Sequence, residues 1–318
     1  MRTFLDFEKP VADVFGKIQE LRSLDGSAAV DASDEIQKLE DKAERALAEI
    51  YAKLTPWQKT EVARHPDRPH TSHYIAELLE DFTPLAGDRA YGEDAAILAG
   101  VGRLAGRSVA LLGHERGADT ESRIKHNFGM ARPEGYRKAR RIMELAERFR
   151  LPVVTLIDTA GAYPGIGAEE RGQAEAIARS TEAALCLTVP SVAVVIGEGG
   201  SGGALALAAS SHVVMLEHAI YSVISPEGAA SILWRDSARA QEAAANMRIT
   251  AQDLLRLGVI DAVVAEPLGG AHRDPVRSMA DTGAAIVAAL DALAPVDGTT
   301  LKAQRMERFL AIGRHLDG

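Results

Sequence analysis

Residues 197–203, which read Gly-Glu-Gly-Gly-Ser-Gly-Gly, constrain the fold of this chain more than any other feature. They follow the run 190–196, whose β-branched residues indicate a buried strand, and precede the alanine- and leucine-rich run 204–209, which favours a helix. Without side chains, the N–H groups at such a helix start can bind a phosphate or an oxyanion that develops during a reaction. The segment therefore predicts a functional site, of one of three kinds.

The first kind is a dinucleotide-binding turn. Gly197, Gly199 and Gly202 have the spacing G-x-G-x-x-G, and Glu217 follows where a ribose-binding acid is expected. The run after the glycines, however, allows barely two helical turns before the next expected strand at 213–216. A helix that connects parallel strands is normally longer, which argues against a nucleotide site.

The second kind is the nucleophile elbow of a hydrolase, because residues 199–203 also fit G-x-S-x-G with Ser201 at the centre. Asp261 and His272 follow in the order that this fold requires. Asp261, however, opens an expected short strand, and His272 lies in a glycine-rich loop, so neither position adds support for a triad. The third kind is an oxyanion hole made of backbone N–H groups without a nucleophile, and the three alternatives stay open at this point.

Composition limits the functions that these glycines can serve. The chain has 318 residues, enough for one large domain or a domain with a long extension, and its net charge of −9 argues against a nucleic-acid surface. Cys186 is the only cysteine, so the chain forms neither an internal disulfide nor a cysteine zinc site, and apolar neighbours predict a buried thiol. Without a signal peptide or a membrane-spanning apolar run, we expect a soluble cytoplasmic protein.

The N-terminal part is polar and helical. Apolar residues three and four apart form one stripe over 31–54, which predicts a long helix that packs on a neighbour or on a second subunit. His65, His70 and His73 follow, but the prolines among them give poor ligand spacing, and we expect no metal there. Residues 74–82 have a helical pattern.

Beyond residue 95, strands, glycine turns and helices alternate. We expect strands at 95–104, 109–113, 152–157, 213–216 and 220–224, helices at 134–149 and 169–187, and a further helix that Ser225 caps and Pro226 begins. A strand, a glycine loop and a helix thus occur twice in succession, with the loops at 158–167 and 197–203. Each repeat places backbone N–H groups at the carboxyl end of a strand, where α/β folds bind ligands.

Six motifs follow one another along the chain. They are 127–130 (Asn-Phe-Gly-Met), 132–139 (Arg-Pro-Glu-Gly-Tyr-Arg-Lys-Ala), 158–165 (Asp-Thr-Ala-Gly-Ala-Tyr-Pro-Gly), 197–203, 225–230 (Ser-Pro-Glu-Gly-Ala-Ala) and 266–273 (Glu-Pro-Leu-Gly-Gly-Ala-His-Arg). In sequence, order and separation they resemble the carboxyltransferase α subunits of multi-subunit bacterial acetyl-coenzyme A carboxylases. The resemblance runs from residues 4–8 to the last helix. Ala160 stands where relatives often carry proline, a departure that alters the stiffness of the loop and not its chemistry.

The resemblance implies an α/β fold, the crotonase-type superhelix of repeated β-β-α units, in residues 86–318, with a helical N-terminal extension in residues 1–85. It also implies that the chain, with a β subunit, transfers a carboxyl group from N-carboxybiotin to acetyl-coenzyme A, which gives malonyl-coenzyme A for fatty acid biosynthesis. The carboxybiotin would be carried on a biotin carboxyl carrier protein, within a larger complex that includes biotin carboxylase. The β subunit, in an α2β2 assembly, would bring zinc and most of the coenzyme A site, so no metal is expected in this chain.

For this reaction we expect two oxyanion donors. Gly202 and Gly203 would supply or shape one donor, and Gly161 and Ala162 the second. The residues expected to bind the biotin group are Gly199, Gly200, Tyr163 and Pro164. For Gly199 and Gly200, a role in close strand–helix packing alone is equally consistent with the sequence.

Other residues near these motifs have less specific expectations. Asp158 would accept N–H groups of its loop, and Glu198 would be a turn residue or an interface contact. Three residues could meet a phosphate of coenzyme A or form a solvated loop face: Arg123, Lys125 and His126. Two further functions stay open from the residues alone, a serine hydrolase built on Ser201 and a scaffold that holds a β subunit through the N-terminal helices.

Overall fold

A mixed eight-stranded sheet forms the centre of the molecule, in a computed structural model that describes residues 3–23 and 28–314. The strand order is β1-β2-β3-β4-β5-β6-β8, and β7 pairs with β5 beyond β6. The strands are β1 Leu79–Pro84, β2 Ile97–Leu104, β3 Arg107–His114, β4 Val153–Thr159, β5 Ser191–Gly200, β6 His212–Leu216, β7 Ile220–Ser222 and β8 Ala262–Val264.

The sheet has an antiparallel part and a parallel part. β1, β2 and β3 are antiparallel, and β2 and β3 join through a tight turn at Ala105 and Gly106, both with positive φ, as expected for a two-residue hairpin. From β3 to β8 the strands are parallel, so their carboxyl ends share one edge. The predicted strand pair and the other predicted strands are confirmed, with ends that differ by a few residues.

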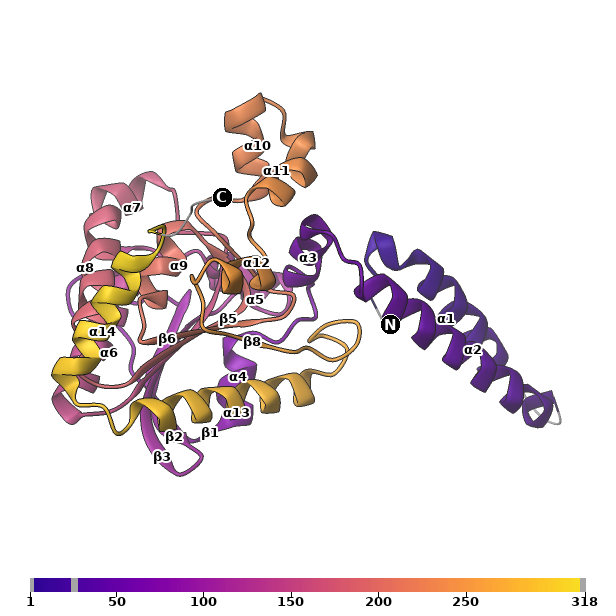
Figure 1. Cartoon of the computed structure of the whole chain (residues 1–318), viewed down its shortest axis with the longest axis horizontal. Coiled ribbons are helices and arrows are strands. Elements are labelled where there is room, and N and C mark those ends of the chain that lie inside the picture. Colours follow the sequence, from indigo (N-terminus) through magenta and orange to yellow (C-terminus); the bar gives the residue numbers. More distant parts are fainter. Residues whose placement is uncertain (1–2, 24–27, 315–318) are drawn as a thin grey trace.

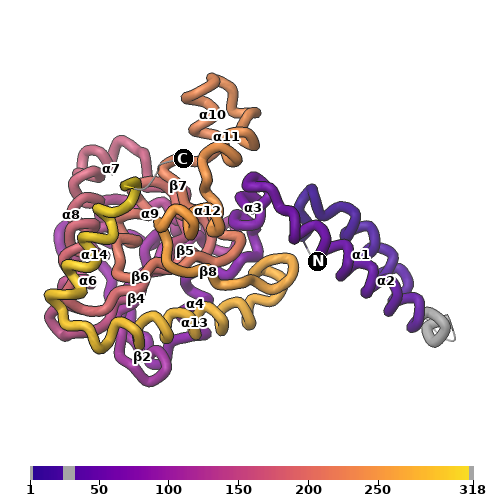
Figure 2. The backbone as a smooth tube through the Cα atoms, in the orientation of Figure 1, coloured from indigo at the N-terminus to yellow at the C-terminus, as the bar shows by residue number. Residues whose placement is uncertain are grey.

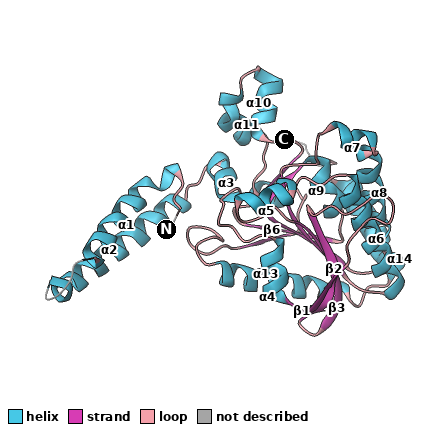
Figure 3. Ribbon diagram, turned by 180° about the vertical axis from the view of Figure 1, so that it is seen from behind, coloured by secondary structure: helices cyan, strands magenta, loops and turns pink. Residues whose placement is uncertain are grey.

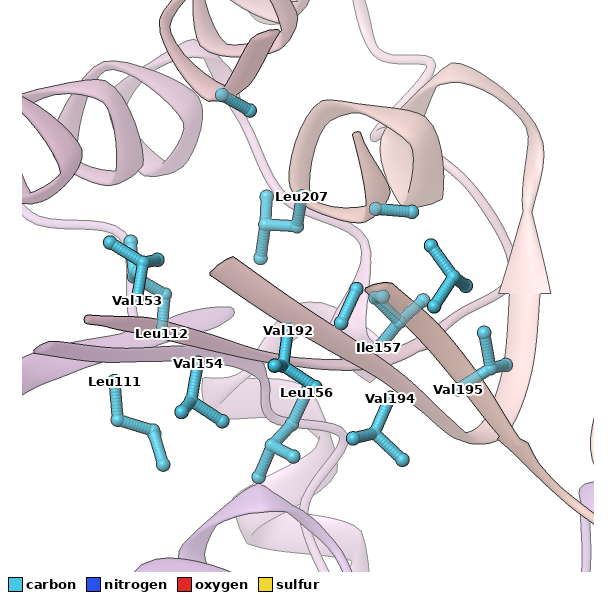
Figure 4. Packing of buried hydrophobic residues seen from close by; sticks show 14 of the residues in the cluster. Leu111, Leu112, Val153, Val154, Leu156, Ile157, Val192, Val194, Val195 and Leu207 are labelled. Atoms are coloured by element: carbon cyan, nitrogen blue, oxygen red, sulfur yellow. The ribbon is translucent and has the colours of Figure 1, made fainter. Parts of the chain in front are cut away.

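Helices cover both faces of the parallel part. α6 (Pro133–Phe149), α8 (Gln173–Cys186) and α9 (Ser201–Ala208) lie on one face, and α13 (Pro275–Leu293) and α4 (Thr71–Leu78) lie on the other (Figure 1). Every residue of β4 and β5 is buried, because a parallel strand between two helical layers is shielded on both sides. The leucine, valine and isoleucine side chains of these strands form the core shown in Figure 4.

Two groups of helices project from this body. α1 (Lys9–Arg22) and α2 (Ala28–Tyr51) pack together as a hairpin that extends away from the sheet, and we call it the N-terminal arm (Figure 2). α10 (Pro226–Trp234) and α11 (Ala240–Asn246) form a second projection (Figure 3). The remaining helices are α3 Pro56–Ala63, α5 Thr120–Lys125, α7 Ile166–Glu170, α12 Ala251–Arg256, α14 Gly298–Ala311 and the 3-10 helices Asp6–Glu8, Asn127–Gly129 and Ser237–Arg239.

Most of the predicted helices are confirmed. The helix predicted over 31–54 is α2, whose stripe packs on α1, and the side chains of residues 28–32 lie outside the described part. Ser225 caps α10 through its Oγ, which accepts the Gly228 N–H, and Pro226 is the first helical residue. The domain boundary at residue 85 stays a prediction. Residues 1–2, 24–27 and 315–318 of the two predicted domains lie outside the described residues.

Three predictions about helix ends and burial were wrong. The helix predicted over 74–82 ends at Leu78, because Leu79–Pro84 pairs with β2, where Gly100 leaves room for the Phe82 ring. The helix predicted over 169–187 is two helices, α7 and α8, separated at Gly172, whose φ is +80°. The thiol of Cys186 is exposed, because Cys186 is the last residue of α8 and points away from the core.

Candidate functional site

The glycine segment has no loop. β5 continues through Gly200, and α9 begins at the next residue, so the loop predicted at 197–203 was wrong. The strand extends this far because it is paired on both sides, with β4 through Gly199 and Thr159 and with β7 through Gly199 and Tyr221. Ser201 makes the change of direction with a left-handed backbone, φ +56°, which is uncommon for a residue other than glycine.

The two predicted donor segments lie directly against each other. A Cβ placed on Gly203 would lie 2.7 Å from the Ala162 N and 2.8 Å from the Gly161 C. A Cβ on Gly200 would lie 2.2 Å from the Ala160 O. These glycines are thus required for the close approach of β5–α9 to the loop after β4, and the structure brings Gly161, Ala162, Gly200 and Gly203 together.

Only one of the two peptides in the first segment has a free N–H. The Gly161 N–H donates to Thr159 Oγ1 at 3.1 Å, while the Ala162 N–H has no hydrogen-bond partner among residues 3–23 and 28–314. Gly161 has φ +147°, a conformation that favours glycine, so its role is to let the chain turn. Ala162 is therefore the better candidate for a donor.

The second segment has free N–H groups for a different reason. The first turn of a helix leaves its N–H groups without intrahelical partners, and α9 has no side-chain cap. Gly202 and Gly203 both lie in this turn. Unlike its neighbours, Gly202 is not needed for packing, since its Cβ would meet only Ile177 Cγ2, at an ordinary 3.5 Å.

An apolar cavity of about 450 Å³ adjoins the start of α9. Its lining includes Ser201, Gly202, Leu205, Tyr221 and Phe309. The Tyr221 ring packs on Gly199, where a Cβ would lie 2.9 Å from its Cδ2. Close packing thus requires glycine at 199 and 200, and the predicted contact of these two residues with biotin stays a prediction.

Tyr163 and Pro164 follow the first donor segment, and Tyr163 is half-buried while Pro164 is exposed. The Tyr163 N–H donates to the Ala131 O at 2.9 Å, and the Arg132 guanidinium lies over the Tyr163 ring, 5.0 Å from its centroid. These contacts hold the ring in one place beside Ala162. Whether it forms a wall of the biotin site stays a prediction.

Buried ion pairs lie close to the donor segments, and no local pattern predicted which groups would pair. Asp158 accepts the Glu198 N–H of β5 at 3.1 Å, in place of the expected N–H groups of its own loop, and it also contacts Arg116 and His70. Glu198 is neither a turn residue nor an exposed contact, because it lies in β5, 3% exposed, and pairs with Arg64.

A second group that sequence reasoning missed is Tyr136. Its hydroxyl is buried, has no partner within the described part of the chain and lies 2.8 Å from the position of a Cβ on Gly203. In the sequence, the position of Tyr136 within the motif 132–139 was the feature that could have indicated a functional role.

The geometry excludes a catalytic triad on Ser201. Asp261 accepts the Val213 N–H at 2.6 Å and pairs with Arg308, at the amino end of β6. His272 instead stacks on His65, with 3.7 Å between ring centroids. Burial and the neighbouring His65 lower the pKa of His272 to about 2, so the imidazole is neutral at pH 7. The predicted acid and base of a hydrolase thus lie apart, each with other partners.

The structure also argues against a dinucleotide-binding turn, because the helix after the glycines is short, as the sequence indicated. α9 has eight residues, and the space beside Gly197 is filled, since a Cβ there would lie 2.5 Å from Asp158 Oδ1. Of the three residues expected on a loop face, Arg123 and Lys125 lie in the helix α5. Among the described residues, Arg123 donates to the carbonyl oxygens of Gly117 and Pro66, and His126 Nδ1 lies 2.6 Å from the Ala95 O.

Comparison with known proteins decides the family. Residues 4–313 match the family described as acetyl co-enzyme A carboxylase carboxyltransferase-like. The chain belongs to this family. It is 66% identical to the acetyl-coenzyme A carboxylase carboxyl transferase subunit alpha of Methylobacterium nodulans, over 99% of this chain and all of that protein. The protein of the same name from Azorhizobium caulinodans is 65% identical over the same shares of the two chains.

Solved structures of carboxylases share the fold of this carboxyltransferase family member. A transcarboxylase 12S chain superimposes with a TM-score of 0.59 at 23% identity, over 72% of this chain and 42% of that one. The β subunit of geranyl-CoA carboxylase from P. aeruginosa gives 0.55 at 16% identity, over 80% and 45%. The chain thus spans less than half of each solved chain. The similarity in fold confirms the predicted crotonase-type fold.

Two further searches concern the described residues only. Within them, no three or more His, Cys, Asp and Glu side chains are grouped so that they could hold a metal ion. None of their helices alone has the length and hydropathy to span a membrane, and only α13 with α14, bent by 116°, passes that test as a pair.

Proposed function

We propose that this chain is the α subunit of an acetyl-coenzyme A carboxylase carboxyltransferase. With a β subunit it transfers the carboxyl group of N-carboxybiotin to acetyl-coenzyme A and forms malonyl-coenzyme A. The observation that carries this proposal is the contact between Gly203 and the Gly161–Ala162 peptide, in a chain that matches the family from residue 4 to residue 313. That contact puts the Ala162 N–H and the N–H groups of the first turn of α9 at the carboxyl edge of one sheet.

The chemistry needs peptide donors more than reactive side chains. When carboxybiotin loses carbon dioxide, negative charge develops on the ureido oxygen, and one well-placed N–H donor lowers such a barrier by about 3 kcal/mol. The Ala162 N–H and the first turn of α9 are the donors that we assign to the two oxyanions. The biotin nitrogen left behind is basic enough to take the acetyl proton, so no side-chain base is required.

The proposed partners follow from the same reaction. The carboxybiotin arrives on a biotin carboxyl carrier protein, and biotin carboxylase belongs to the same cytoplasmic system. The β subunit, in an α2β2 complex, supplies a zinc site and most of the coenzyme A site. The names of the relatives as alpha subunits support a multi-subunit assembly.

The reverse reaction tests the proposal. Malonyl-coenzyme A and biocytin are incubated with this chain alone, with its β partner alone and with both, and release of acetyl-coenzyme A is followed. We expect turnover only in the mixture. A mixture that forms a complex in gel filtration and yet shows no turnover contradicts the assignment and favours the scaffold function.

Substitution of the one serine in the glycine segment separates this mechanism from a hydrolase. We expect Ser201→Ala to keep the rate of the mixed subunits within about tenfold, because the donors are peptide groups, whereas loss of a nucleophile typically costs about 10⁶ in kcat. The measurement is kcat in the reverse reaction. A loss of that larger size would return the nucleophile mechanism to consideration.

A further inference from the structure

Each proposed donor segment is preceded by a buried carboxylate. Asp158, near the end of β4, comes shortly before Gly161 and Ala162, and Glu198, near the end of β5, comes shortly before Gly202. The side chains of both acids are nearly inaccessible, 3% and 4% exposed. Two carboxylates this close in a buried place repel each other unless a cation lies between them.

Arg116 is that cation. Its Nη1 lies 3.1 Å from Asp158 Oδ1 and 3.5 Å from Glu198 Oε2, so one guanidinium contacts both strands. The same Asp158 oxygen accepts the Glu198 N–H at 3.1 Å. Arg116 therefore closes a bridge between β4 and β5 where their regular pairing ends, since the register shifts between Ile157 and Thr159.

The bridge is held from outside by a tight turn. Asn127, Phe128 and Gly129 all have positive φ, and a Cβ on Gly129 would lie 2.8 Å from Arg116 Cγ and 2.7 Å from the Asp158 O. The stem of Arg116 thus passes close to Gly129, which leaves it no space to move toward the motif 127–130. Positive φ in two adjacent residues other than glycine is strained and persists only where the surroundings enforce it.

The two acids also have separate partners on their far sides. Arg64 holds Glu198 through Nε at 3.0 Å and Nη2 at 2.6 Å, and it reaches Glu227 at the start of α10. His70 Nδ1 lies 3.3 Å from Asp158 Oδ2. Burial would raise the pKa of Asp158, but Arg116 and His70 more than offset it, so the pKa lies well below its usual range. Asp158 is therefore ionised at neutral pH.

We propose that Arg116 is a positioning residue for carboxyl transfer, because its guanidinium fixes the separation between the two peptide donor segments through Asp158 and Glu198. The inference rests on the proposed function of these segments. Arg116 does not touch the reacting atoms. Without it, the two carboxylates separate or one takes up a proton, and the loop after β4 moves relative to α9.

A buried arginine at the opposite edge of the sheet provides a matched control. Arg305 is 1% exposed and donates to the Leu187 O at 2.6 Å and to Ser211 Oγ at 2.7 Å, near the amino ends of β5 and β6. Its loss removes a comparable buried cation and its hydrogen bonds, but far from the donor segments. Arg305→Gln thus reports what general destabilisation does to the enzyme.

The experiment uses the full chain assembled with its β subunit. In the reverse reaction we expect Arg116→Gln to lower kcat by roughly 100-fold, the size of effect that follows a misplacement of about 1 Å. KM for malonyl-coenzyme A and for biocytin should stay within about threefold, since the binding surfaces are intact. Arg116→Lys, which keeps the charge, should have a kcat at least about tenfold above that of Arg116→Gln. Arg305→Gln should lower Tm and leave kcat within about threefold.

Hydrogen exchange gives a readout that does not depend on turnover. In Arg116→Gln, amide exchange should accelerate in peptides that cover 158–164 and 197–204 and stay unchanged in α1 of the N-terminal arm, whereas Arg305→Gln should leave the first two peptides unchanged. Unchanged exchange at both donor segments overturns the inference, as does a kcat of Arg116→Gln near wild type or an equal fall of kcat in Arg305→Gln. If the wild-type complex itself is inactive, the proposed function fails, and the exchange data still decide whether Arg116 positions the two segments.

Discussion

Gly203→Ala is expected to lower kcat of the assembled carboxyltransferase at least about 100-fold, the cost of losing one oxyanion donor. The added Cβ would lie 2.7 Å from the Ala162 N and 2.8 Å from the Gly161 C, and these are backbone atoms that cannot rotate out of the way. Either α9 or the loop after β4 must therefore shift, and both carry proposed donors. The measurement is kcat in the reverse reaction, with complex formation followed by gel filtration.

The N-terminal arm offers a control for this substitution. Gly16 lies in α1, and a Cβ there would have nothing within 4 Å, so Gly16→Ala should leave kcat within about twofold and make the helix slightly more stable. A Gly203→Ala variant that forms the complex and keeps more than a tenth of wild-type kcat would show that the contact with Ala162 is not part of the mechanism. Loss of turnover with an intact complex would also exclude the scaffold function.

Removal of Arg68 is expected to cost about 3–5 kcal/mol in the free energy of unfolding, the usual cost of leaving a buried charge without its partner. Arg68 and Glu266 are 1% and 0% exposed in their side chains and share two hydrogen bonds, of 2.8 and 2.6 Å. Arg68 also donates to the Ile196 O of β5 at 2.6 Å. We propose Arg68→Met, which keeps much of the volume, measured by urea denaturation at pH 7.

An exposed ion pair serves for comparison. Arg140 and Glu144 lie one turn apart on α6 with side chains 44% and 55% exposed, so Arg140→Met should cost less than about 1 kcal/mol. Equal losses in the two variants would contradict the argument from burial.

The Arg68–Glu266 pair also predicts how the stability depends on pH. Burial raises the pKa of Glu266, but Arg68 outweighs it and lowers the pKa from 4.5 to about 2. A carboxyl whose pKa is lower in the folded state stabilises fully above its unfolded pKa, and this contribution is lost as pH falls from about 4.5 to about 2. The difference in stability between wild type and Arg68→Met should therefore be largest near pH 7 and shrink below pH 4.5. A constant difference across this range would refute the linkage.

Local sequence was enough for much of the fold. The β-branched runs before 158 and 197 predicted β4 and β5, and Ser225 with Pro226 marked the start of α10. These features could be read because each depends on a few neighbouring residues. The pairing of the two donor segments was also predicted, from the repeat of strand, glycines and helix and from the resemblance to the family.

The rest depends on contacts between distant segments. β1 is a strand because it pairs with β2, and its own residues favour a helix as much as a strand. Gly197–Gly200 are poor strand formers, yet β4 and β7 pair with this stretch from both sides. The bridge through Arg116 joins residues 42 and 82 positions apart, which no local pattern can reveal. The free N–H of Ala162, in place of Gly161, likewise depends on where one threonine hydroxyl points.

Because β5 passes directly into α9, genes that encode this fold cannot gain or lose codons at that junction. A turn such as the one at Ala105 and Gly106 can accept an insertion, since nothing packs against Gly106. At the junction of Gly200 and Ser201, no loop residue separates the strand from the helix. One added or deleted residue would exchange the two faces of the strand end, or rotate α9 by about 100° about its axis. We therefore expect length changes in homologous genes to fall at surface turns and to be absent between codons 191 and 208.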